Sequence, residues 1–488
     1  YCDSIVNAEN ELKNQNGLIQ MLHRQVQHAN LDNSQWEKTP DESNNIAYTI
    51  PAHKTATRYL RITHALDSDA SDVDYQIRIR EQRDVNDSPP SPSSHDSTST
   101  WTLFIYAMGD NDLYPYMGDS IEMGMLSRLK ELEGVPESGV SIVLLLDGPG
   151  PRDTNYYTLD SSGMWGMLPR DEFRMDEEDT LASFLKWGFE RYDNSDYYAL
   201  SILGHASGVR GLGPDLSSNS EESLALLEPM EIRQAIQAAE DFGQIDVIQF
   251  DGCSFGLFES AAIVDDLADY VIASPNTGWG IFDYDVYRGL AGEASTPYDY
   301  SAKVATHYAD KLENLYYPYT ISVFDMAKYD DVKSAMDEFG NALSTYVDGI
   351  DARQQELRTL RSTVQIYDSN NYIIDEQDDH YIDLTGFAQA VVDNINDDIV
   401  IETAKTVLGI VSNFVVYNRN KSGQFYNDLR HETIDIDLDK AHGIGIFYPY
   451  SRALGAQAWE NYTNNEIFRN LTTDWGWKKF LANGIPPL

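Results

Sequence analysis

Short apolar runs alternate with longer segments of helical periodicity through the middle of the chain. The runs are rich in β-branched residues and predict buried strands, and the segments between them predict helices. Short strands separated by helices are typical of a parallel sheet that is covered on both faces. We therefore predict an α/β fold. The predicted strands are 102–107, 140–146, 198–203, 245–250 and 269–274, and the predicted helices are 119–133, 179–192, 229–241 and 256–267.

The pattern changes at both ends of this region. Residues 1–82 contain short strand-like runs with period-two alternation and predict a small β-rich accessory region. Residues 83–100 include the run SPPSPSSHDSTST, which is too rich in Pro and Ser to form a core and predicts a linker. We assign 101–299 to the α/β core and 300–488 to a C-terminal part, helical with some strand.

Two chemically reactive residues follow predicted strands. His205 comes directly after the strand 198–203, and Cys253 lies between the strand 245–250 and the helix 256–267. The carboxyl ends of parallel strands share the edge of the sheet where ligands bind, so a nucleophile and its base could meet there. A helix that begins just after Cys253 would favour the thiolate. The alternatives are a buried structural cysteine and a structural histidine.

At these residues the chain resembles the clostripain-like cysteine peptidases, relatives of the caspases, legumains and gingipains. The resemblance rests on His205, on Cys253 and on Asp251 two residues before the cysteine. Ala206 departs from the family pattern, which usually has Gly after the catalytic histidine. The resemblance runs over roughly residues 100 to 485. Its further motifs, in family order, are TLFIYAMGDND, SPNTGWGIFDY, YIDLTGFAQAV, GIGIFYPYS and WGWKKFL.

The resemblance implies a caspase-like, mostly parallel sheet and a cysteine endopeptidase with a Cys253/His205 dyad. The backbone N–H groups of Cys253 and Ala206 would hold the oxyanion. Asp251 and, less directly, Asp283 would bind an Arg or Lys side chain of the substrate, although an Asp before a helix is also a common cap. Family members are often secreted, made as zymogens and calcium-dependent. The segment 213–230 contains no Lys or Arg at which such an enzyme could cut itself.

A second mechanism can be drawn from the same stretch. The sequence GCSFG at 252–256 matches the nucleophile elbow of serine hydrolases, with Ser254 as nucleophile and His442 as a later histidine. That mechanism leaves His205 without a role. His307, His380, His431 and His442 do not have metal-ligand spacing, so we expect structural roles for them.

Composition narrows the range of partners. The 488 residues include 79 acidic and 35 basic side chains, a formal net charge of −44, which argues against nucleic acid and anionic membranes. Cys2 and Cys253 are the only cysteines, so no disulfide framework is expected. No apolar run approaches the roughly 20 residues that span a bilayer. We expect protein or peptide substrates with basic residues.

Overall fold

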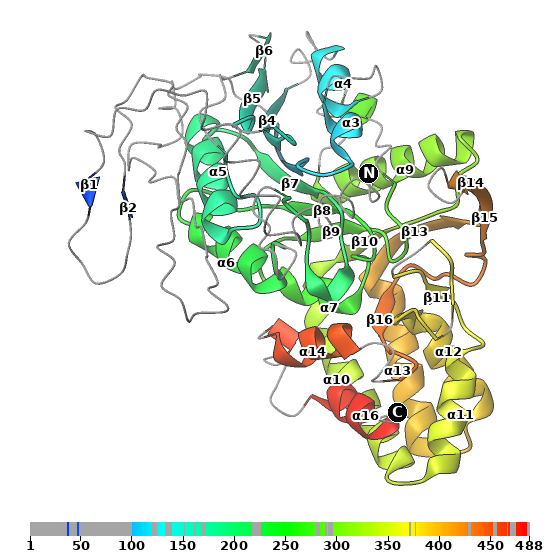
Figure 1. Ribbon diagram of the computed structural model, residues 1–488. Helices are drawn as coiled ribbons and strands as arrows, with labels where there is room; N and C mark the ends of the chain where they lie inside the picture. Colours follow the sequence, from blue (N-terminus) through cyan, green and yellow to red (C-terminus); the bar gives the residue numbers. More distant parts are fainter. Residues whose placement is uncertain are drawn as a thin grey trace, which may run out of the picture. The chain divides into compact units, whose positions relative to one another are not determined.

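A mostly parallel sheet forms the centre of the computed structural model (Figure 1). Among the described residues it has nine strands in the order β13-β10-β9-β8-β7-β3-β4-β5-β6. The five strands from β9 to β4 are parallel, and an antiparallel pair extends the sheet at each edge. The predicted sheet is therefore confirmed. The strands are β3 (Trp101–Met108), β4 (Val140–Asp147), β5 (Asn155–Asp160), β6 (Gly163–Gly166), β7 (Tyr197–Leu203), β8 (Val247–Asp251), β9 (Tyr270–Ala273), β10 (Tyr319–Asp325) and β13 (Val415–Lys421).

The chain divides into two units, Tyr1–Gln82 and Arg83–Leu488. In the first, β1 (Glu37–Lys38) and β2 (Ile46–Ala47) pair antiparallel, and the other strands predicted there lie outside the described residues. The structure describes residues 37–38, 46–47, 100–118, 124–131, 139–150, 152–160, 163–166, 172–216, 226–279, 284–287, 290, 296–369, 372–375, 377–427, 431–451, 456–465, 467–468 and 475–485.

Successive side chains of the central strands enter two separate cores. In β3, Phe104 and Tyr106 belong to one buried cluster, whereas Leu103 and Ile105 belong to the other. Side chains alternate between the faces of a strand, so a run that is apolar at every position needs cover on both faces. That cover comes from helices on each side. On the Phe104 face these are α5 (Glu178–Arg191), α6 (Pro229–Ala239) and α7 (Phe258–Ile263), and on the other face α4 (Met125–Glu131) and α9 (Pro297–Asn314).

The region after residue 300 adds two strands, β10 and β13, to the central sheet, besides its helices. A boundary at residue 299 therefore separates strands that share one sheet. The helices gather below the sheet in Figure 1. They are α10 (Tyr329–Val347), α11 (Asp351–Arg361), α12 (Leu384–Asn394), α13 (Asp398–Phe414), α14 (Ala456–Asn464) and α16 (Gly476–Gly484), and the remaining strands are β11 (Ile366–Tyr367), β12 (Tyr381–Asp383), β14 (Gly423–Asn427), β15 (Glu432–Ile436) and β16 (Gly445–Phe447).

The C-terminal part is joined directly to the turn that follows β8. The N–H of Gly445 donates to the carbonyl oxygen of Gly256 at 2.8 Å. The fully buried carboxylate of Glu259 in α7 accepts the N–H of Phe447 in β16 at 3.0 Å. Burial raises the pKa of Glu259 to about 8. These contacts tie the turn and the start of α7 to β16.

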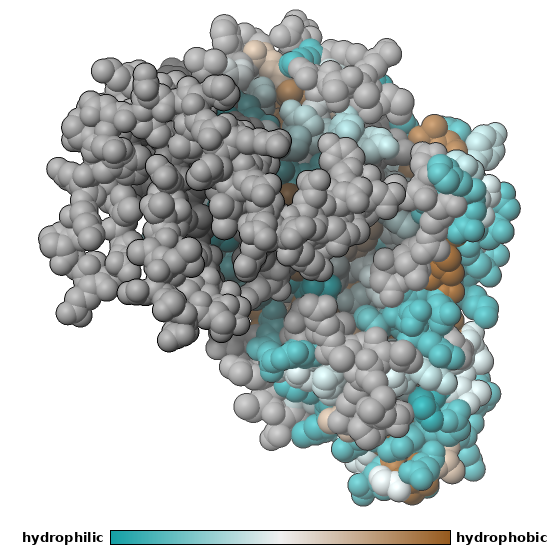
Figure 2. Space-filling model, in the orientation of Figure 1, coloured by the Kyte–Doolittle hydropathy of each residue, from teal (hydrophilic) through white to brown (hydrophobic). Residues whose placement is uncertain are grey.

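The coloured surface in Figure 2 is mainly hydrophilic, with small apolar areas among the polar ones. Exposed large apolar side chains such as Tyr316 and Ile399 are scattered, as is normal for a folded protein in water. Within the described ranges, no helix combines the length and the hydropathy needed to cross a membrane.

Candidate functional site

The turns after β7 and β8 lie side by side at the carboxyl edge of the sheet. Leu203 pairs with Asp251 in the parallel register, and the N–H of Gly204 donates to the carbonyl oxygen of Asp251 at 3.3 Å. His205 and Cys253 each lie two residues beyond this paired position. The register therefore places both residues in adjacent turns, as the two strand ends predicted.

Close backbone packing joins these turns to each other. A Cβ added at Gly252 would lie 2.7 Å from the Cβ of Ala206. A Cβ added at Gly278 would lie 2.6 Å from the carbonyl oxygen of Gly252 and 3.3 Å from the nitrogen of Cys253. The distances of 2.7 Å at Gly252 and 2.6 Å at Gly278 are shorter than ordinary van der Waals contact. Only glycine therefore fits at these two positions without a shift of the neighbouring atoms. Ala206 itself is accommodated because residue 252 has no side chain.

His205 contacts the carboxylate of Asp112, which the sequence did not predict as a site residue. Its Nε2 lies 2.6 Å from Oδ1 of Asp112, in the turn after β3, which is the strand next to β7. The imidazole is one-third exposed and the carboxylate is largely exposed. The hydrogen bond from His205 holds the pKa of Asp112 below its usual value. Asp112 belongs to the motif TLFIYAMGDND, but its partner is 93 residues away along the chain.

Asn111 fixes the turn that carries Asp112. Its Nδ2 donates to the carbonyl oxygens of Met108 at 2.9 Å and Pro214 at 3.1 Å, and its Oδ1 accepts the N–H of Leu113 at 3.0 Å. Asn111 is buried, so these bonds are shielded from water. The turn is thereby tied to the strand before it and to the loop that follows His205.

Cys253 does not lie at a helix N-terminus, so that part of the prediction is wrong. The helix α7 begins at Phe258 and has only six residues. The N–H groups of Ser254, Phe255 and Gly256 instead donate to carbonyl oxygens of the next loop, those of Asn276 and Ser274. Among the described backbone groups the N–H of Cys253 has no such acceptor.

The surroundings of Cys253 favour the thiol over the thiolate. The side chain is partly accessible, and the sulfur lies 3.7 Å from the carbonyl oxygen of Gly278, to which the thiol donates weakly. Burial of the sulfur raises its pKa to about 11, and the negative charges of Asp368 and Asp251 add to the rise. A thiol with a raised pKa needs a base to accept its proton before it can act as a nucleophile.

Asp251 lines a small pocket beside the cysteine. Gly252, Gly278 and the phenol of Tyr308 form other parts of its wall. Asp251 is buried, and burial raises the pKa of its carboxyl group to about 7. Burial also raises the pKa of the Tyr308 phenol, and the charges of Asp251 and Cys253 add to that rise. The phenol therefore does not lose its proton readily. Asp283, the second predicted carboxylate, lies outside the described residues.

The alternative nucleophile and its histidine are engaged elsewhere. Ser254 is buried, and its hydroxyl donates to the carbonyl oxygen of Asp368 at 3.1 Å. The Nδ1 of His442 lies 2.9 Å from Oδ1 of Asp383, and this hydrogen bond raises the histidine's pKa. Each member of the predicted serine pair therefore has a structural partner of its own.

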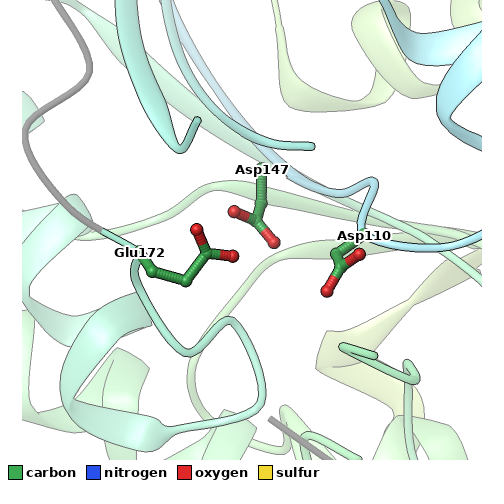
Figure 3. Close-up of side chains that lie close together, drawn as sticks. All are labelled: Asp110, Asp147 and Glu172. Carbon is green, nitrogen blue, oxygen red and sulfur yellow. The ribbon is translucent and has the colours of Figure 1, made fainter. Parts of the chain in front are cut away.

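Among the described residues, one group of side chains has the spacing to hold a metal ion: Asp110, Asp147 and Glu172 (Figure 3). None of the scattered histidines belongs to it. His380 is partly buried, and its removal from water lowers its pKa to about 4, so it is neutral. The acidic group lies at the same edge of the sheet as Asp112.

A sequence comparison and a structure comparison with known proteins point to the same family. A sequence profile of the clostripain family matches residues 105–483. No curated protein matched the chain. A secreted C11 cysteine protease from Bacteroides thetaiotaomicron, solved with an irreversible peptide inhibitor, is 16% identical with a TM-score of 0.58, covering 76% of this chain and 99% of that one. An inactive zymogen C11 protease from Parabacteroides distasonis is 17% identical with a TM-score of 0.56, covering 77% and 98%. At these identities the structural likeness concerns the fold.

Proposed function

The chain belongs to the clostripain family of cysteine peptidases, and from that premise we propose that it hydrolyses peptide bonds after Arg or Lys with Cys253 as nucleophile and His205 as base. The observation that supports this assignment most is the register of β7 and β8. It sets His205 and Cys253 at equal distances beyond one paired position on adjacent parallel strands.

Proton transfer from Cys253 to His205 starts the reaction in this proposal. Because Asp112 lies against Nε2 of His205, the tautomer with the proton on Nε2 is favoured and Nδ1 is left as the base. The Cys253 proton moves to Nδ1 as the sulfur attacks the peptide carbonyl carbon. Asp112 then stabilises the imidazolium without taking a proton itself. The raised pKa of Cys253 makes this base necessary.

The later steps use the same groups. The carbonyl oxygen becomes an oxyanion that accepts a hydrogen bond from the N–H of Cys253 and a second from the N–H of Ala206. Imidazolium gives its proton to the leaving amine as the C–N bond breaks, which leaves a thioester on Cys253. Imidazole next accepts a proton from water, whose oxygen attacks the thioester. The acid product leaves as the proton returns to the sulfur.

Asp251 supplies the preference for a basic side chain. It is the last residue of β8, two positions before the nucleophile, and it faces the pocket beside Cys253. The guanidinium of a substrate Arg in the pocket would give the Asp251 carboxylate a charge-assisted hydrogen bond, in place of the water contacts that burial removes. A neutral side chain would leave a buried carboxylate unpaired, which costs several kcal/mol unless it is protonated.

We further propose that the peptidase acts outside the cytoplasm. The similar protein from Bacteroides thetaiotaomicron is described as secreted. The strong negative charge repels nucleic acid and favours encounters with basic polypeptides.

Covalent labelling tests the assignment of the nucleophile. We expect an arginyl peptide with a thiol-reactive ketone to modify the full chain on Cys253, as seen by mass spectrometry of the digested protein. The same reagent with Leu in place of Arg should react much more slowly. The Ser254→Ala variant should be labelled like the wild type. Labelling of Ser254 by a fluorophosphonate, with Cys253 unmodified by the arginyl reagent, would contradict the proposal.

The substitution Asp112→Asn should lower kcat by about 10- to 1000-fold and leave KM for the peptide nearly unchanged. Asn removes the charge that stabilises the imidazolium but not the substrate pocket. The side chain is 80% exposed, so the melting temperature should change little. Steady-state kinetics and thermal unfolding measure both effects.

Asp266→Asn is the matched control for Asp112→Asn. Asp266 is also an exposed aspartate with a side-chain partner, Arg233 at 2.7 Å, but it precedes β9 at the opposite edge of the sheet. Its substitution should leave kcat unchanged. A rise in KM or a fall in stability without a fall in kcat for Asp112→Asn would show that Asp112 has only a structural role.

A further inference from the structure

The pocket beside Cys253 has a second polar side chain from β8 in its wall. Gln249 lies two residues before Asp251 in this strand, whose sequence is VIQFD. Alternate side chains of a strand share a face, so Gln249 and Asp251 point to the same side of the sheet. Both line the pocket, together with Tyr308 of α9 and Ile321 of β10. The proposed chemistry uses Asp251 and gives Gln249 no role.

Gln249 has a carbonyl oxygen that the surrounding protein leaves unsatisfied. The residue is 6% exposed, and within the described part of the chain its Oε1 has no hydrogen-bond partner. The hydroxyl of Ser274, in the same wall, lies 2.7 Å from Oγ1 of Thr320. The phenol oxygen of Tyr308 accepts the N–H of Trp279 at 2.9 Å. A buried polar atom without a partner is rare, so an unpaired acceptor in a substrate pocket indicates a donor on the ligand.

The strand sets the depth of Gln249 in the pocket. Asp251 is the last residue of β8 and lies nearest to the turn with the nucleophile. A strand rises about 3.3 Å per residue, so Gln249 lies roughly 7 Å farther from the carboxyl edge of the sheet. Tyr308 and Ile321 belong to the buried cluster on this face and form the apolar part of the wall. A side chain that enters beside Cys253 would therefore pass Asp251 first and meet Gln249 with its tip.

Arg and Lys differ in the donors that they would bring to this depth. The guanidinium of Arg has five N–H donors in a planar fork, whereas the ammonium of Lys has three on a single nitrogen. One nitrogen bridges two acceptors only if these lie within about 6 Å, twice the length of a hydrogen bond. The spacing of Asp251 and Gln249 along the strand, roughly 7 Å, exceeds this limit. A guanidinium can pair with the Asp251 carboxylate through one edge and donate to Oε1 of Gln249 through another N–H.

We propose that Gln249 binds the guanidinium of a substrate Arg and makes the peptidase select Arg over Lys. This inference rests on the proposed function, because it requires that the basic side chain before the scissile bond enters the pocket beside Cys253. Asp251 supplies the charge that favours either basic residue. Gln249 supplies the acceptor that distinguishes the two.

The ratio of kcat/KM for two peptides that differ only in Arg or Lys before the scissile bond tests this role. The wild-type chain should prefer Arg by about 10- to 100-fold, the range expected for one hydrogen bond to a charged group. Gln249→Met keeps the length of the side chain without a strong acceptor, so the ratio should fall to about 1 through slower cleavage of the Arg peptide alone. Gln249→Glu keeps an acceptor oxygen at the same reach and should retain the preference.

Thermal unfolding shows whether the variants are folded. Met has no unpaired amide to bury, so Gln249→Met should melt at the same temperature as the wild type or higher. Gln249→Leu is a second variant with the same expected loss of selectivity. Gln365→Met is the matched control. Gln365 is 5% exposed, but its amide donates to the carbonyl oxygens of Ile366 and Asp437, outside the pocket. This variant should melt at a lower temperature and keep the Arg-to-Lys ratio.

Binding without hydrolysis separates this inference from the proposed function. Calorimetry of the full chain with Cys253→Ala should show Nα-acetyl-arginine methylamide binding about 10-fold more tightly than Nα-acetyl-lysine methylamide. Adding Gln249→Met should remove the difference. Arg-selective binding to a chain whose wild type hydrolyses neither peptide would refute the proposed function alone. Equal Arg and Lys values in the wild type, or an Arg preference that persists in Gln249→Met, would overturn the role of Gln249 and leave water as the partner of its oxygen.

Discussion

Replacement of Cys253 by Ala is expected to abolish peptide hydrolysis while the protein stays folded. The change removes the sulfur that attacks the carbonyl carbon, and no other group in the turn can form the thioester. We expect kcat/KM to fall about 10⁴-fold or more. The thiol makes only a weak hydrogen bond to Gly278, 3.7 Å from the carbonyl oxygen, so little stability should be lost. Hydrolysis of an arginyl peptide and thermal unfolding measure the two effects.

The matched control is the neighbouring serine. Ser254→Ala removes a buried hydroxyl that donates to the carbonyl oxygen of Asp368, so it should cost about 1 kcal/mol of stability. It should keep most of the activity because the Ser254 hydroxyl is buried and has no role in the proposed chemistry. The serine mechanism predicts the reverse pair of results. An active Cys253→Ala enzyme together with an inactive but folded Ser254→Ala enzyme would therefore show that the assignment of the nucleophile is wrong.

Replacement of Asp251 by Asn should remove the preference for a basic side chain before the scissile bond. The native enzyme should cleave Arg and Lys peptides far better than otherwise identical Leu and Asp peptides. In Asp251→Asn we expect kcat/KM for the Arg peptide to fall on the order of 100-fold or more, with little change for the Leu peptide. Loss of the charge that pairs with the guanidinium is the physical reason.

The same preference should depend on pH. The pKa of Asp251 is raised to about 7, so its carboxylate is charged mainly above that pH in the free enzyme. The ratio of Arg to Leu cleavage should therefore increase as pH rises from about 6 to 8, and the ratio in Asp251→Asn should not follow it. A Leu peptide cleaved as fast as the Arg peptide at pH 8 would contradict the proposed specificity. An unchanged Arg preference in Asp251→Asn would place the charge on another residue, such as Asp283.

Stability provides a check on the Asp251 variant. The folded-state pKa lies above the unfolded value of 3.8, so the contribution of Asp251 to stability is lost as pH rises from about 4 through 7. Asn does not ionise, and at pH 8 the variant should be at least as stable as the wild type. Asp246→Asn is the matched control. Asp246 precedes β8 at its other end, also with a raised pKa, and accepts the N–H of Tyr198 at 2.7 Å.

The local pattern of the sequence determined the strands and helices of the core. An apolar run such as that of β3 has side chains on both faces, so it can be stable only inside a covered sheet, whatever its neighbours are. The positions of His205 and Cys253 followed from the same pattern, because each comes directly after such a run. The motifs in their order were sufficient to indicate the family.

Only the tertiary structure decided which distant groups meet. Asp112 and His205 are 93 residues apart, and strand order together with register brings them into contact. The cluster of Asp110, Asp147 and Glu172 arises in the same way, since 79 acidic residues offer no local signal for any three of them. Tertiary contacts also decided the residue at which α7 begins. The N–H groups just after Cys253 bind carbonyl oxygens of the loop after β9, and a long-range contact of that kind leaves no periodicity in the sequence.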